Sequence, residues 1–328
     1  MSHTNLLATI PADLYIHIIL PYLDIKSALR LKGVSRTLRA IVAEYQSTYT
    51  APLTIVKHDH IWPMLKQFPQ SIFTLLNPAK SIKNNPAIVA IKFKGKSLKS
   101  CIKHLQDLSS VVALEINFAT LIARGNIIMI DQKSVFSMIQ LTHLDMSMEG
   151  VPEKCRIDAN LSNLVNLTIL KLVKCSNVRG IPELVNLISL TLVECHFSED
   201  IDGYSIRNLT QLRYLKLSSV DLVIHTFAYL VNLEKLYTRY IQLFIHNLGV
   251  LTKLRILSII NRHVTYLNNI DFSTMTNLVS LSLNNIRYET HDLSPLVNLT
   301  ELYLYNCPRI TPPAHQLKYY INRTTNRD

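Results

Sequence analysis

The stretch that decides the fold is Leu-Val-Asn-Leu-Thr-Ile-Leu-Lys-Leu at residues 164–172, because near copies of it recur along most of the chain. Clear copies lie at 184–192, 209–217, 230–238, 251–259, 275–283 and 296–304, and weaker ones at 88–93, 108–116 and 141–146. The closing Leu-x-Leu of each copy alternates with period two, so both leucines point inward from a short strand while the residue between them points outward. The pattern predicts one short strand per copy.

The spacing of the copies predicts a stacked array. Successive gaps between the first strand leucines are 23, 30, 26, 20, 25, 21, 21, 24 and 21 residues. One copy is too short to bury its own leucines, so it buries them against its neighbours. We therefore expect ten anchors to stack in register, at Ile91, Leu114, Leu144, Leu170, Leu190, Leu215, Leu236, Leu257, Leu281 and Leu302.

The pattern and the period resemble leucine-rich repeats, which run at ~20–29 residues. The resemblance implies an α/β solenoid of about ten repeats over residues 85–311, with parallel strands on its concave face. Three residues past the second strand leucine stand Cys175, Cys195 and Cys307. In the family this position takes Asn or Cys, which bonds the backbone of the turn. These ends resemble the cysteine-containing subclass of repeats, which is often joined to F-boxes.

The first fifty residues carry no repeat and predict three short helices. Thr9 can cap a helix that begins at Pro11, where the missing N–H of proline costs nothing. Asp24 can cap a second helix, and Gly33 precedes a third with apolar residues at helical spacing. Such a small three-helix module has little independent stability and is expected to lean on a partner or on the solenoid.

Residues 6–45 resemble an F-box. The matching positions are Ile10, Pro11, Asp13, Leu14, Ile18, Ile19, Leu23, Asp24, Leu29, Arg30, Leu31, Val34 and Arg36. The chain departs from the family with Ser35 for the usual Cys, Leu38 for a common Trp, and Pro21 inside the first helix. The resemblance implies apolar binding to the adaptor of SCF-type cullin-RING ubiquitin ligases, and through it to a cullin. Its likeliest adaptor contacts are Pro11, Leu14, Ile18, Leu23 and Val34; the alternative is that they only form the core of the module.

The expected organisation is therefore an F-box module at 1–50, a connector and cap at 51–84, repeats at 85–311 and a C-terminal cap or tail at 312–328. The formal charge is +11. Residues 51–110 hold nine lysines against two aspartates, which leaves +4 for the rest of the chain. This basic stretch is expected to be either a solvated face or an electrostatic attractor for acidic partners.

A second cluster of charge is predicted on the concave face. The outward positions of two adjacent repeats bring together Tyr214, Lys216, Lys235, Tyr237 and Arg239, with Lys171 two repeats away. Tyrosines supply rigid contact area, and clustered Lys and Arg grip acidic or phosphorylated segments. We expect a substrate-binding patch here; the alternative is an ordinary polar surface.

Several classes of protein are not expected. The seven glycines are isolated from one another, so no phosphate-binding loop is possible, and no catalytic signature occurs. No CxxC pair is present, and His58 and His60 form a lone His-x-His with no third ligand in register, so neither metal nor cofactor is predicted. No apolar run reaches the length of a membrane span and no secretory signal begins the chain, which predicts a cytoplasmic or nuclear protein. The lysines of 57–103 lack clustered aromatics, which argues against nucleic-acid binding.

The function favoured by the sequence is a non-catalytic substrate receptor of an SCF-type ubiquitin ligase, whose F-box binds the adaptor while its repeats bind a substrate protein. The alternative is a leucine-rich-repeat scaffold, or a protein that sequesters the adaptor, acting outside an active ligase.

Overall fold

The computed structural model describes, besides Ala40 and Val42, residues 53–55, 73–76, 88–94, 109–117, 135–149, 158–197, 206–221, 223–246, 248–261, 271–286 and 290–323. Ala40 and Val42 are helical. The rest of the predicted three-helix module lies outside the described residues.

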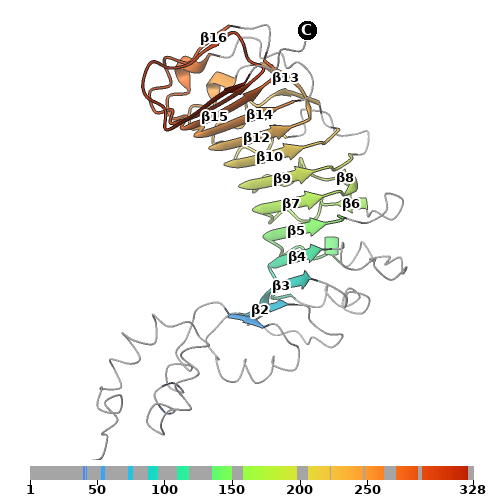
Figure 1. Cartoon of the computed structure of the whole chain (residues 1–328). Coiled ribbons are helices and arrows are strands. Elements are labelled where there is room, and N and C mark those ends of the chain that lie inside the picture. The colour runs from blue at the N-terminus through green and yellow to red at the C-terminus, as the bar shows by residue number, and fades with distance from the viewer. Residues whose placement is uncertain are drawn as a thin grey trace, which may run out of the picture.

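The main element is one parallel sheet of thirteen strands that runs the length of the described chain (Figure 1). In spatial order its strands are β1 (Leu53–Ile55), β2 (Phe73–Leu76), β3 (Ile88–Lys94), β4 (Ala113–Asn117), β5 (His143–Ser147), β7 (Ile169–Val173), β9 (Ser189–Val193), β10 (Tyr214–Ser218), β12 (Lys235–Arg239), β14 (Ile256–Ile260), β15 (Ser280–Asn284), β17 (Glu301–Tyr305) and β19 (Tyr319–Arg323).

The register of this sheet confirms the predicted stacking. Ile91 pairs with Leu114, Leu114 with Leu144, and so on through every anchor to Leu281 with Leu302. All ten anchors are buried and belong to one continuous core. The chain is a parallel β-solenoid of the leucine-rich-repeat type.

The α/β class needs a correction, since the side opposite the main sheet is not helical in the described residues. Helix there is limited to a turn at Val135–Phe136 and two 3-10 turns, η9 (Leu248–Val250) and η10 (Phe272–Thr274). Short parallel pairs replace helices: β6 (Asp158–Asn160) with β8 (Ser176–Arg179), β11 (Val223–Thr226) with β13 (Gln242–His246), and β16 (His291–Asp292) with β18 (Ile310–Thr311). Extended chain rises ~3.3 Å per residue against ~1.5 Å in a helix, so short repeats close with fewer residues.

A tight turn after six of the main strands, β7, β9, β10, β12, β15 and β17, directs the chain into the second row. The residue just past the strand has a left-handed backbone, with φ of 57° at Lys174, 50° at Glu194 and 50° at Ser219. The backbone N–H of each donates to the last carbonyl of the next strand, for example Lys174 to Val193 at 2.8 Å. Tyr240, Asn285 and Asn306 repeat this arrangement farther along.

The asparagines of the repeated Leu-Val-Asn-Leu bind successive repeats together. The side-chain amide of Asn186 donates to the carbonyl of Val165 at 2.9 Å, and that of Asn232 to the carbonyl of Thr210 at 3.0 Å. Asn166, Asn277 and Asn298 make the same bond to the preceding repeat. Each of these bonds satisfies a turn carbonyl that faces no strand.

At the C-terminal end of the sheet, β19 adds one strand beyond the last predicted repeat. It pairs in register with β17, Leu302 opposite Tyr320, and all five of its residues are exposed. The segment predicted as a cap or tail therefore extends the sheet.

Candidate functional site

The exposed side of the thirteen-stranded sheet, here called the sheet face, corresponds to the predicted concave face. Leucines occupy the second and fourth positions of a typical strand and are buried, while the first, third and fifth positions are open. In β10 and β12 these open positions hold the five residues predicted to bind substrate. The register places Tyr214 beside Lys235, Lys216 beside Tyr237 and Ser218 beside Arg239. We call Tyr214, Lys216, Lys235, Tyr237 and Arg239 the basic–tyrosine patch.

The two tyrosines form the centre of the patch. Their ring centroids lie 5.6 Å apart at an interplanar angle of 42°, a tilted contact that holds each ring against the other. Partial burial, followed by the proximity of Tyr214 and Glu301, raises the pKa of Tyr237. Its phenol therefore stays neutral at neutral pH and can donate a hydrogen bond to an anion.

Three cations surround the tyrosines. Lys216, Lys235 and Arg239 are all exposed, and within the described ranges none of them has a carboxylate partner. The guanidinium of Arg239 lies 4.8 Å from the ring centroid of Tyr240, which holds it at the end of β12. Nearby, Arg213 is already paired with Glu234 at 3.4 Å. The patch thus presents positive charge that can bind an anionic group of a ligand.

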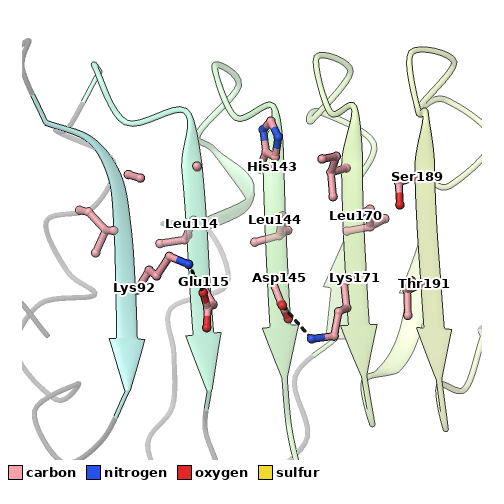
Figure 2. Close-up of a pocket in the computed structure, with 14 residues that line it drawn as sticks. Lys92, Leu114, Glu115, His143, Leu144, Asp145, Leu170, Lys171, Ser189 and Thr191 are labelled. Atoms are coloured by element: carbon pink, nitrogen blue, oxygen red, sulfur yellow. Dashed lines mark hydrogen bonds and ion pairs between the residues drawn. The ribbon is translucent and has the colours of Figure 1, made fainter. Parts of the chain in front are cut away.

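A hollow of about 280 Å³, which the repeat pattern does not predict, lies on the sheet face beside the patch. Figure 2 shows the strands that form it, from β3 to β9. At the first open position of these strands, the small Ala90, Ala113 and Ser189 lie in one row with the larger His143 and Ile169. Ile169, 40% exposed, stands among them as an apolar wall.

Two ion pairs cross the hollow from strand to strand (Figure 2). Lys92 Nζ lies 2.8 Å from Glu115 Oε2, and Lys171 Nζ lies 2.8 Å from Asp145 Oδ2. Lys171 therefore does not add to the basic–tyrosine patch as the sequence analysis expected, because Asp145 on the adjacent strand neutralises it. These two pairs make the hollow electrically balanced.

The three turn cysteines lie where the repeat pattern placed them, and all three are buried. Cys195 Sγ donates to the carbonyls of Leu172 and Val193, and Cys307 Sγ to those of Leu283 and Tyr305, which confirms backbone bonding in the turn. The side-chain hydrogen bond with Cys175 lowers the pKa of Cys195, whereas burial raises the pKa of Cys307.

The predicted adaptor contacts Pro11, Leu14, Ile18, Leu23 and Val34 lie outside the described residues, and their role stays a prediction. In the part of the chain that the structure describes, no three His, Cys, Asp or Glu side chains gather as a metal site would require. Within the same residues, no helix has the length and apolar character to cross a membrane.

No protein-family model matches the sequence, and no curated protein matches it. Solved structures do match. The chain is similar to TLR13 in a TLR13–ssRNA13 complex, at 19% identity and a TM-score of 0.49, over 84% of this chain and 42% of that one. It is similar to an internalin of Listeria monocytogenes, at 17% identity and a TM-score of 0.47, over 97% of this chain and 100% of that one. It is also similar to a Leptospira interrogans LRR protein, at 16% identity and a TM-score of 0.44, over 73% of each chain. The chain thus spans less than half of the TLR13 chain.

Proposed function

We propose that this protein is a non-catalytic receptor that binds an acidic or phosphorylated segment of a partner protein on the sheet face of its solenoid. The observation that carries the proposal is the basic–tyrosine patch, where three cations without a carboxylate partner among the described residues flank a packed tyrosine pair. Each exposed charge pair contributes only ~0.2–1 kcal/mol, so a useful affinity needs all three cations or a phosphate. The tyrosines add rigid contact area whose ordering costs little entropy.

The finer proposal is that the receptor serves an SCF-type ubiquitin ligase in the cytoplasm or nucleus. It rests on the resemblance of residues 6–45 to an F-box, whose apolar residues would bind the adaptor. The ligase would then supply the transfer chemistry, and the solenoid would only hold the substrate within reach of it.

Reciprocal variants of the full chain test the two halves separately. The patch variant reverses Lys216, Lys235 and Arg239 to Glu, and the module variant carries Leu14→Asp with Ile18→Asp. A matched control reverses Arg179, Arg207 and Lys253, which are exposed away from the sheet face and give the same change in net charge.

Affinity purification from cells should recover adaptor, cullin and an acidic client with both the wild type and the control. The patch variant should lose the client and keep the adaptor, while the module variant should lose adaptor and cullin and keep the client. If the patch variant still binds the client, the proposal that the patch is the receptor site is wrong. Adaptor recovered without any ubiquitinated client would favour a sequestering scaffold instead.

A further inference from the structure

The hollow and the basic–tyrosine patch are neighbours on one continuous surface. Strand β9 closes the hollow, and β10 begins the patch. In register, Ser189 lies beside Tyr214 and Thr191 beside Lys216. The small Ser189 and Thr191 on β9 therefore lie directly beside the large Tyr214 and Lys216 on β10. A ligand that lies along the sheet face and contacts the patch reaches the hollow without leaving the surface.

From this juxtaposition we infer that the hollow is an anchor pocket for one apolar side chain of the same acidic segment that the patch binds. The inference rests on the proposed function and deepens it. The volume of about 280 Å³ falls just below the ~300–1,000 Å³ of pockets that hold drug-sized ligands, so it suits a side chain better than a free metabolite.

The chemistry of the hollow also favours an apolar group. Its two lining lysines, Lys92 and Lys171, are paired with Glu115 and Asp145 on adjacent strands, and the Nδ1 atom of the lining His143 lies 2.8 Å from Thr142 Oγ1. Ala90, Ala113 and Ile169 line it with hydrocarbon. An apolar side chain buried there loses its contact with water without separating either ion pair.

The strand order sets the spacing that the ligand must have. The middle of the hollow lies at β5, and β7 and β9 separate it from β10. At ~4.8 Å per strand the patch is about 14 Å away at β10 and about 19 Å away at β12. Because an extended chain advances ~3.3 Å per residue, acidic residues should stand about four to six positions from the apolar anchor.

Fluorescence anisotropy with synthetic labelled peptides tests this geometry on the full-length protein. The peptides carry one Leu and an Asp-Asp pair, separated by two to eight Ser or Gly residues in either order. A matched series replaces the Leu by Ala, and another replaces Asp by phosphoserine, which separates carboxylate from phosphate recognition. Burial of the Leu should strengthen binding about tenfold or more over the Ala peptide, with an optimum near four to six positions.

Ala113→Leu fills the hollow and should abolish the advantage of the Leu peptide, while the weaker binding of the Ala peptide persists. Ser282→Leu makes a comparable addition on β15, away from the hollow, and should leave the advantage unchanged. The peptide series on the wild type decides the question even if Ala113→Leu does not fold.

Two results would overturn the inference: a Leu that brings no advantage at any spacing, or an advantage that survives Ala113→Leu in a folded protein. If charged peptides bind and respond to the patch variant but ignore the Leu, the anchor pocket fails and the proposed function stands. If no acidic peptide binds at all, both fail.

Discussion

The substitution Leu215→Ala tests how the solenoid is held together. Leu215 is fully buried in β10 and pairs in register with Leu190 on one side and Leu236 on the other. Its truncation leaves a cavity between two well-packed repeats, and such Leu→Ala changes cost about 2–5 kcal/mol. Because each repeat contacts only its neighbours, the loss should be concentrated at the interfaces of β9, β10 and β12.

Guanidinium denaturation followed by circular dichroism measures the loss of stability, and native-state hydrogen exchange locates it. We expect a lower midpoint together with faster exchange of the amides in β9, β10 and β12. The matched control is Val231→Ala, whose side chain is 47% exposed at a turn and should change stability by no more than about 0.5 kcal/mol. Faster exchange spread evenly over all strands, or equal effects of the two substitutions, would refute nearest-neighbour stacking.

Three further predictions concern turns and caps. Gly180→Ala should lower the midpoint, because Gly180 has φ of 82° and a Cβ there would lie 2.3 Å from the backbone nitrogen of Ser162; an unchanged midpoint would contradict the turn geometry. Asn232→Ala should cost about 0.5–1.5 kcal/mol in the same assay, since it removes the bond to the carbonyl of Thr210 and the bond accepted from Lys253 Nζ, whereas no loss would rule out a stabilising asparagine ladder. Hydrogen bonds from the side chain and backbone of Ser294 lower the pKa of Asp292, so its contribution to stability is present at neutral pH and is lost as the pH falls through that lowered pKa. Asp292→Asn should therefore make the free energy of unfolding fall less steeply as the pH is lowered. An unchanged pH dependence of the free energy of unfolding would contradict this prediction.

The spacing of the leucines was enough to predict the register of the sheet. Ten anchor residues separated by unequal gaps nevertheless pair with one another, because the period-two alternation leaves only one way to bury both leucines of a strand. The same alternation brought Tyr214, Lys216, Lys235, Tyr237 and Arg239 together on two neighbouring strands.

Other features depended on interactions that no local pattern reveals. The left-handed turn residues Lys174 and Glu194 are types that rarely adopt positive φ, and the turn holds them there through bonds to the next strand. The partner of Lys171 lies 26 residues away, across an irregular interval in the repeats. The hollow depends on the small side chains of Ala90, Ala113 and Ser189, which lie on different strands and come together only in the folded sheet.

Site-specific cross-linking in cells can show whether a partner protein docks an acidic segment on the basic–tyrosine patch. The photo-reactive residue p-benzoylphenylalanine would replace Tyr237 in one protein and Val297, which is 67% exposed outside the sheet face, in another. The account predicts a cross-linked peptide rich in Asp, Glu or phosphorylated residues from position 237 and none from position 297, with the product lost on charge reversal of Lys216, Lys235 and Arg239. Equal cross-linking from both positions, or a product that survives the charge reversal, would contradict it.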